Sequence, residues 1–259
     1  MQRKAKTPVP ITRKAFEKTD TTAVYWLGNG GAMINSHDTV ILIDPLLKGF
    51  DMKSLIEPPL KPEDIVRVDA ILITHSDNDH MSLPTLAALP NLPVIHAPHY
   101  VAELLDEKGI QAIGHDINEA FTIGDIKVRL TPADHAWQNE SPKHHTRDFQ
   151  LEDFCGFYLT TPDGKIWMPG DSRLMEEQLH QETPDLILLD ISDSRWHIGK
   201  EGVVRLTGAY PESKLLPIHW GCVDAPEWKE FNGDPDEIKN MIVNPERFHE
   251  AAPGESWQL

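Results

Sequence analysis

The sequence predicts a layered α/β domain in which helices cover β-sheets. Short apolar runs rich in Val, Ile and Leu recur along the chain and are typical of buried strands. Turn residues separate the early runs, as expected for hairpins, whereas helical patterns alternate with the later ones. Four of the runs also lead to a His or Asp residue, which indicates a site at one edge of the sheets.

The predicted strands are the apolar runs Ala23–Leu27, Thr39–Ile43, Ala70–Thr74, Pro93–His96, Ile126–Thr131, Cys155–Thr160, Lys165–Met168, Leu186–Leu189 and Leu215–Ile218. The turn sequences Gly28-Asn29-Gly30-Gly31 and Ser36-His37-Asp38 predict hairpin links. Helices are expected at Ser82–Leu89, Tyr100–Lys108, Arg173–Gln181, Lys200–Ala209 and Pro235–Met241. In the first helix, Ser82 is the expected N-cap and Pro84 lies in the first turn.

The length of 259 residues and the hydrophobic fraction of 40% are compatible with one large core, so we expect a single domain over residues 1–259. Residues 1–20 carry several basic side chains, and no apolar stretch follows them. This pattern argues against a secretory signal peptide and predicts a basic, partly mobile N-terminal arm. No apolar run approaches the roughly 18 residues that a membrane span requires.

The net charge of −17, from 24 basic and 41 acidic residues, disfavours nucleic acid as a partner, because phosphate neutralisation needs Lys and Arg. The two cysteines, Cys155 and Cys222, lie far apart and form no CxxC pair. We therefore expect them to be reduced in a cytoplasmic protein. The expected partner is a small-molecule substrate, and the segment after Asn232 could contact a second copy in a homo-oligomer.

Four predicted strands each lead to a side chain that can bind metal, shortly after the last buried residue. These side chains are His75, His135, Asp171 and His219. Chance would scatter such residues over loops and helix faces. Strand ends that converge on one edge are where α/β folds commonly build sites, so we expect these side chains to lie together.

The segment Thr74-His75-Ser76-Asp77-Asn78-Asp79-His80 places four candidate ligands within six residues. Alternate residues of an extended loop point the same way, so His75, Asp77 and Asp79 can face one pocket, while His80 turns towards a neighbouring position. Imidazole and carboxylate ligands suit zinc, iron and manganese. Structure alone rarely needs such a cluster, so the segment predicts a metal site.

These residues resemble the motifs of the metallo-β-lactamase superfamily. The family motif H-x-H-x-D-H, followed by a distant His, a bridging Asp and a final His, is matched by His75-x-Asp77-x-Asp79-His80, Ala133–Trp137, Pro169–Ser172 and Pro217–Gly221. The resemblance covers roughly residues 22–225. The opening Trp26–Ala32 and the stretch from Trp196–Gly199 to His219–Gly221 resemble the branch of ascorbate-phosphate lactonases and N-acyl phosphatidylethanolamine phospholipase D. The implied fold is the αββα sandwich of two mixed β-sheets flanked by helices, with the site at one edge.

The resemblance implies a site for two divalent metal ions, which we expect to be zinc, with manganese or iron as alternatives. The implied ligands are His75, Asp77 and His135 for one ion, Asp79, His80 and His219 for the other, and Asp171 as a bridge. Asp77 departs from the family pattern, since most members have His there. An oxygen ligand is chemically sound, and the superfamily's diiron flavoproteins carry a carboxylate at this place. In the alternative, Asp77 only hydrogen-bonds a ligand and the site binds one metal tightly.

The implied activity is metal-dependent hydrolysis, in which a water activated by the dinuclear centre attacks a small ester-like or anionic substrate of the lactone or phosphodiester class. Asp79 is expected to orient the nucleophile as well as to bind metal. His197 is the candidate second electrophile or proton donor, because its counterpart in the phospholipase branch lines the pocket; the alternative is a helix-start histidine without a role. The rival functions are a diiron protein that handles oxygen or redox chemistry on the same fold, and a catalytically silent binding module.

Weaker signals surround these residues. Asp44 resembles a carboxylate that orients a ligand histidine, with a helix or turn cap as the alternative. The loop Gln138–Asp148 could contact an anionic substrate through Lys143, His144, His145 and Arg147. Arg173 and Arg195 are either pocket cations or members of surface ion pairs, and Trp137, Trp196 and Trp220 either line the pocket or belong to the core.

Overall fold

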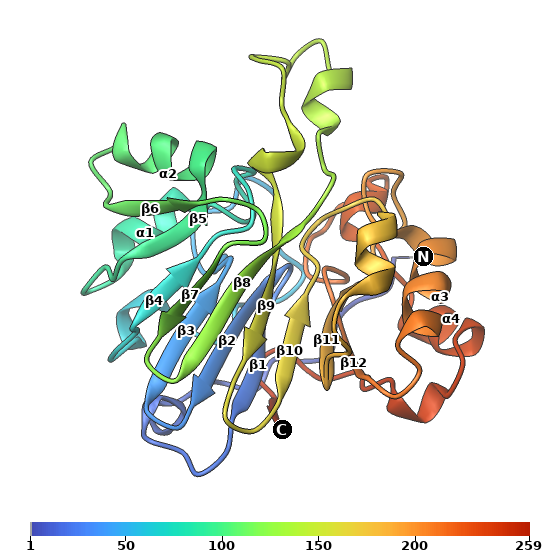
Figure 1. Cartoon of the computed structure of the whole chain (residues 1–259), viewed down its shortest axis with the longest axis horizontal. Helices are drawn as coiled ribbons and strands as arrows, with labels where there is room; N and C mark the ends of the chain where they lie inside the picture. Colours follow the sequence, from blue (N-terminus) through green and yellow to red (C-terminus); the bar gives the residue numbers. More distant parts are fainter. Residues whose placement is uncertain (1) are drawn as a thin grey trace.

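The computed structural model describes residues 2–259, and in it two mixed β-sheets pack face to face with helices on their outer sides (Figure 1). The first sheet has the strand order β13-β1-β2-β3-β4-β5-β6, and the second has the order β12-β11-β10-β9-β8-β7. Helices α1 and α2 pack against the first sheet, and α3 and α4 against the second. This arrangement confirms the predicted αββα sandwich.

The first sheet consists of β1 (Ala23–Gly28), β2 (Gly31–Ser36), β3 (Thr39–Ile43), β4 (Ala70–Leu72), β5 (Ile95–Pro98), β6 (Ala112–His115) and β13 (Ser256–Gln258). The second consists of β7 (Ala120–Ile123), β8 (Ile126–Pro132), β9 (Cys155–Thr160), β10 (Lys165–Met168), β11 (Leu186–Asp190) and β12 (Lys214–Ile218). The helices are α1 (Leu83–Ala88), α2 (His99–Asp106), α3 (Gly199–Ala209) and α4 (Pro235–Met241).

All nine predicted strands are present, and four further strands, β2, β6, β7 and β13, were not among them. β2 lies between the two predicted hairpin turns and is wholly buried. β6, β7 and β13 are short and carry exposed side chains, so they lack the apolar pattern of a buried strand. The predicted helix Arg173–Gln181 is wrong, because only Glu176–His180 forms a 3-10 turn. The backbone N–H of Arg173 donates instead to Asp134 O at 2.8 Å, and Met175 is extended.

Strand direction explains why the candidate ligands meet. β9 pairs antiparallel with both β8 and β10, whereas β10, β11 and β12 pair in parallel, so β8, β10, β11 and β12 run the same way. In the first sheet, β3, β4 and β5 are parallel. The segments that follow β4, β8, β10 and β12 therefore leave the sheets at one edge of the sandwich (Figure 1).

The core between the sheets contains large buried aromatic side chains, among them Trp26, Trp167 and Trp220. Trp220 stacks on Trp26 with ring centroids 5.8 Å apart, so its role is packing and it is not a pocket wall. A second apolar cluster lies between the first sheet and its helices. Ser82 caps α1 as predicted, because its side chain accepts a hydrogen bond from the Thr85 N–H.

The N-terminal segment, expected as a basic and partly mobile arm, lies against the body of the structure. Ala5, Ile11 and Phe16 are buried, and the backbone N–H of Ala5 donates to Gly221 O at 2.9 Å. The basic side chains of this segment face solvent. Cys155 and Cys222 are both free thiols and buried. Within residues 2–259, none of the helices is long and apolar enough to cross a membrane.

Candidate metal centre

The structure brings the seven predicted ligands together at the edge where the two sheets end. His75, Asp77 and His135 form one triad and Asp79, His80 and His219 form another, with the ligand atoms of each triad within 4.8 Å of one another. Between them lies Asp171, whose Oδ2 is 3.1 Å from His80 Nε2 and 3.3 Å from His219 Nε2. The two triads and the carboxylate between them are the arrangement that the resemblance implies.

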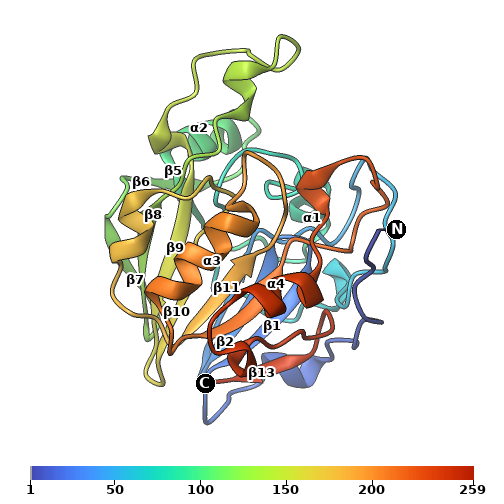
Figure 2. The same ribbon diagram turned by 90° about the vertical axis from the view of Figure 1, so that its right-hand side faces the viewer.

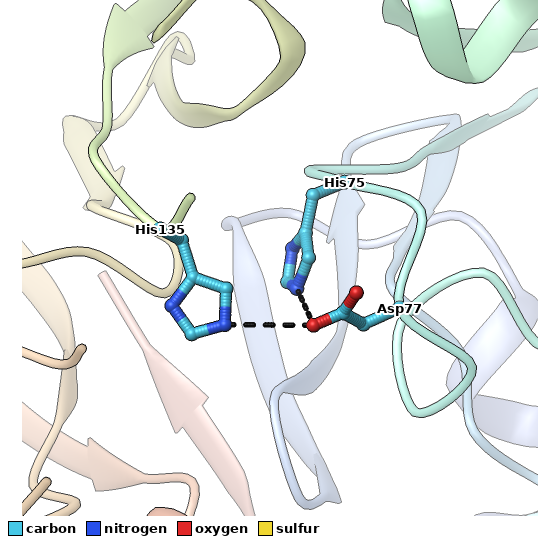
Figure 3. Close-up of side chains that lie close together, drawn as sticks. All are labelled: His75, Asp77 and His135. Atoms are coloured by element: carbon cyan, nitrogen blue, oxygen red, sulfur yellow. Dashed lines mark ion pairs between the residues drawn. The ribbon is translucent and has the colours of Figure 1, made fainter. Parts of the chain in front are cut away.

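Asp77 belongs to this cluster even though the family pattern has His at its position. Its Oδ2 lies 3.5 Å from His75 Nε2 and 3.5 Å from His135 Nε2, so the carboxylate stands between the two imidazoles (Figure 3). His75 and Asp77 come from the loop after β4, and His135 comes from the segment after β8. The triad therefore joins the two sheets.

The four ligand histidines share one orientation. Each holds its Nδ1 against a partner in the protein and directs its Nε2 towards the carboxylates of the centre. The Nδ1 partners are Thr74 Oγ1 for His75 at 2.9 Å, Asp44 Oδ2 for His80 at 2.9 Å, Trp196 O for His135 at 2.8 Å, and Ser192 Oγ and Glu230 O for His219, both at 3.0 Å. Such anchoring selects one tautomer and fixes the ring, as metal-binding histidines require.

Asp44, which follows β3 of the first sheet, holds two of these histidines in place. It is fully buried, and its carboxylate accepts hydrogen bonds from the Thr74 N–H at 2.8 Å, the Thr74 hydroxyl at 2.6 Å and His80 Nδ1 at 2.9 Å. The Thr74 hydroxyl in turn contacts His75 Nδ1. One carboxylate thus orients a histidine of each triad, which agrees with the sequence prediction and excludes a mere turn cap.

We expect Asp44→Asn to weaken zinc binding about 10–100-fold, because the amide cannot accept all three hydrogen bonds and His80 loses its fixed orientation. Asn tolerates the left-handed backbone that Asp44 adopts, with φ 43°, so the backbone can be kept. Competition with a chromophoric chelator measures the affinity. Asp69→Asn is the control, since Asp69 also accepts a backbone hydrogen bond, from Val40, but lies at the other end of β4. Equal zinc affinities in the two variants would contradict the role of Asp44.

His219 has a strained backbone. Its φ of 61° lies in the left-handed region, which costs a non-glycine residue about 1–3 kcal/mol. The conformation is held by the hydrogen bond from its N–H to Asn29 O at 2.8 Å and by Ser192 Oγ, which donates to its carbonyl at 2.8 Å. Strain of this kind concentrates at functional sites, where the surrounding structure over-determines one conformation.

Burial and neighbouring charges shift the pKa values of the centre in opposite directions. Burial raises the pKa of Asp171, but the charges of His219 and His80 outweigh it and hold that pKa well below its usual range. Burial lowers the pKa of His219, but Asp171 and the hydrogen bond with Asp79 outweigh it and raise that pKa to about 9. The ionised carboxylates thus favour a protonated imidazole at His219, and a cation bound there would replace that proton.

A buried nitrogen atom without a partner is separate evidence that the centre suits a metal ion. His75 Nε2 is completely buried and has no hydrogen-bond partner within residues 2–259, although a buried polar atom without a partner is costly. It faces Asp77, and its Nδ1 is already engaged. A divalent cation bound by His75, Asp77 and His135 would satisfy this atom, and nitrogen and oxygen donors suit zinc, manganese and iron.

A cavity of about 750 Å³ opens onto the centre. Four residues of the candidate centre line it, namely Asp77, Asp79, His135 and Asp171. Its walls are rich in aromatic side chains, namely Phe50, Trp137, Trp196, Trp228 and Phe231. Lys143 is the only lysine or arginine among the described residues that line it. The cavity has the size of a small-molecule site, and it combines these aromatic walls with acidic side chains that include Asp51 and Glu230.

His197 also lines this cavity and is nearly completely buried. Its Nδ1 donates to Asp190 Oδ2 at 2.6 Å, and its Nε2 lies 3.8 Å from Asp171 Oδ2. Asp190 is itself fixed, because its other oxygen accepts the Ser192 N–H at 2.8 Å. His197 is thus held with one nitrogen facing the centre, which a helix-start histidine without a role would not require.

The two arginines considered as pocket cations form surface ion pairs instead. Arg173 pairs with Asp134, and Arg195 pairs with Glu140. Both guanidinium groups lie over the ring of Trp196, outside the lining of the cavity. In the loop after His135, Lys143 and His144 line the cavity, whereas His145 and Arg147 pair with Asp148 and Asp153.

Several supporting residues were not identified from the sequence. They are Asn29, whose Nδ2 donates to Asp79 Oδ2 at 2.9 Å, together with Ser192, Asp190 and Gln138. Asp190 offered a signal, because it ends the apolar run of β11 at the same edge as the predicted ligands. Asn29 lies in the Gly-Asn-Gly-Gly turn, where its type is equally well explained by turn chemistry.

Comparison with known proteins places this geometry in a family context. A sequence model of the beta-lactamase superfamily domain matches residues 39–220. A UPF0173 metal-dependent hydrolase of Archaeoglobus fulgidus is 25% identical over 245 residues, which cover 91% of this chain and 98% of that protein.

Solved structures show the same fold at lower sequence identity. The isothiocyanate hydrolase from Delia radicum gut bacteria superposes with a TM-score of 0.74 at 18% identity, over 92% of this chain and 98% of that one. Igni18, a metallo hydrolase from Ignicoccus hospitalis, superposes with a TM-score of 0.69 at 19% identity, with the same coverage of 92% and 98%. The likeness extends over nearly the whole length of each chain.

Proposed function

The chain belongs to the beta-lactamase superfamily, and on this basis we propose that it is a metal-dependent hydrolase that holds two divalent ions. The proposal depends chiefly on the four histidines of the centre. The Nδ1 atom of each is held by a hydrogen bond, and their Nε2 atoms converge. One of these, His75 Nε2, is buried without a hydrogen-bond partner among the described residues. The name metal-dependent hydrolase of the relatives supports the same activity.

The proposed ligands are His75, Asp77 and His135 for one ion, Asp79, His80 and His219 for the other, and Asp171 between them. Zinc is the expected metal. Manganese and iron are the alternatives, because imidazole and carboxylate ligands without a thiolate suit all three metals. When bound, such ions lower the pKa of water and polarise the group under attack. Asp79 is held by Asn29 and is placed to orient the attacking water.

We propose an ester-like substrate, such as a lactone, with an apolar group beside the reacting carbonyl. The aromatic walls would hold the apolar group and exclude bulk water, and Lys143 offers one cation at the cavity. In the reaction, the water oxygen would bond to the carbonyl carbon and the ester C–O bond would break, and the proton that the water loses would replace the one given to the leaving oxygen. His197 is the proposed donor of the proton that the leaving oxygen receives. A phosphodiester remains the second substrate class to be assayed.

The test is metal analysis combined with a small substrate panel. The protein is purified without chelator, its metals are measured, and hydrolysis of a phenyl-substituted lactone, bis-(p-nitrophenyl) phosphate and benzyl isothiocyanate is followed. We expect about two zinc or manganese ions per chain, loss of hydrolysis after removal of metal, and recovery when metal is restored. Iron with a visible band that changes on reduction would favour the diiron alternative. Absence of metal after reconstitution would leave a binding module.

A further inference from the structure

The segment between β8 and β9 projects from the sandwich. Residues 137–153 extend beyond the sheets in both views (Figures 1 and 2) and include two short 3-10 turns, Trp137–Glu140 and Leu151–Asp153. Its base is closed by Asn139, which donates to Phe149 O and accepts from the Phe149 N–H, both at 2.8 Å. Phe149 packs in a small cluster with Ala133 and Phe154, and Tyr100 of α2 packs against this cluster.

This projecting segment is tied to the metal centre at one residue. Trp137 Nε1 donates to Asp77 Oδ2 at 2.7 Å, and Gln138 Nε2 donates to Asp77 Oδ1 at 2.7 Å. Gln138 is buried, and both carboxylate oxygens are engaged. Hydrogen bonds to an ionised acceptor are stronger than neutral ones, so these two contacts fix the root of the segment.

The same segment forms one wall of the cavity. Trp137, Ser141, Lys143 and His144 line it, and the rings of Trp137 and His144 lie 5.1 Å apart. The Asp77 carboxylate is therefore one of the anchors of this wall, and it holds the end of the wall that is nearest to the centre. Each carboxylate oxygen has two lone pairs, so Asp77 can bind a cation and keep both donors.

We propose that Trp137 and Gln138 are positioning residues that couple metal binding at Asp77 to the position of the cavity wall at residues 137–144. The inference rests on the proposed metal centre. A bound cation fixes the Asp77 carboxylate, to which Trp137 and Gln138 both donate hydrogen bonds, so the segment opens less often. Without the cation, Asp77 lacks this additional restraint and the wall is released more often. The occupied centre thereby completes its own substrate-binding surface.

The test is the rate of trypsin cleavage after Lys143 and Arg147 in the full chain, followed by mass spectrometry with and without saturating zinc. Cleavage in the segment reports its open population. We expect zinc to slow cleavage of the unmodified protein roughly tenfold, given the strength of hydrogen bonds to charged groups. Trp137→Phe and Gln138→Leu each remove one donor, and we expect the protection by zinc to be largely lost, while elemental analysis still finds zinc in the variants.

Trp228→Phe is the matched control. Trp228 lines the same cavity but is 55% exposed and lies outside the Asp77 contacts, so zinc should protect this variant as it protects the unmodified protein. Zinc-loaded Trp137→Phe and Gln138→Leu with unmodified protection would overturn the coupling. Equal cleavage rates of the unmodified protein with and without bound zinc would overturn it as well. A chain that binds no metal would overturn the proposed function and this inference together.

Discussion

Replacing Asp171 with asparagine is expected to lower hydrolysis by at least about 10³-fold, corresponding to about 4 kcal/mol of lost transition-state stabilisation. Asp171 Oδ2 lies within 4.0 Å of three ligand histidines, His80, His219 and His135. Asparagine keeps the volume but removes the charge that would balance the two proposed cations. We therefore expect metal content to fall to one ion per chain or fewer.

Asp106→Asn is the control for this loss of charge. Asp106 is an exposed carboxylate at the end of α2, and its replacement should leave metal content and rate unchanged. Circular dichroism and a urea titration separate loss of metal from loss of fold. An Asp171→Asn variant with two bound ions and ordinary rates would show that Asp171 does not bridge the centre.

His197→Gln is expected to lower kcat about 10²-fold while metal content stays unchanged, because general acid catalysis contributes at least that much. The imidazole is fixed by Asp190 and faces Asp171 across 3.8 Å, which suits a group that donates a proton at the cavity rather than one that is required to retain the metals. The effect should be smaller for substrates with a good leaving group, such as a p-nitrophenyl ester. The comparison of leaving groups therefore separates proton donation from a loss of packing.

His180→Gln is the matched control, since His180 lies at the surface and pairs with Glu176. It should leave kcat and the dependence on the leaving group unchanged. If His197→Gln loses metal in proportion to its rate, His197 is a ligand and the proton-donor role is wrong.

Local signals predicted the layered α/β architecture and the residues of the centre, and the family resemblance implied the sandwich. Buried strands such as β11 and β12 are continuous apolar runs, and four candidate ligands lie in one segment from His75 to His80. Strand ends then predicted which distant residues would join them, and the structure brings these residues together. That they bind metal, and which branch of the superfamily the chain resembles, stay predictions.

The supporting contacts could not be predicted, because they join residues that no local pattern links. Gln138 reaches Asp77 across 61 positions, and Asn29 reaches Asp79 across 50. The roles of the tryptophans were equally ambiguous in the sequence. Trp137 comes two residues after the predicted ligand His135, and Trp220 directly follows His219. Only the packing shows that the first lines the cavity and the second stacks on Trp26. The Arg173 helix failed for the same reason, since a hydrogen bond to Asp134 overrides local propensity.

The origin of the ligands in both sheets has a mechanical consequence. His75 and Asp77 follow a strand of the first sheet, whereas His135, Asp171 and His219 follow strands of the second. Bound ions would therefore act as cross-links between two halves of the chain, much as a disulfide does between distant segments. Because the ligands of each ion come together only in the folded chain, a bound ion would stabilise the folded state by mass action, so metal supply would raise the stability of the protein as well as its activity.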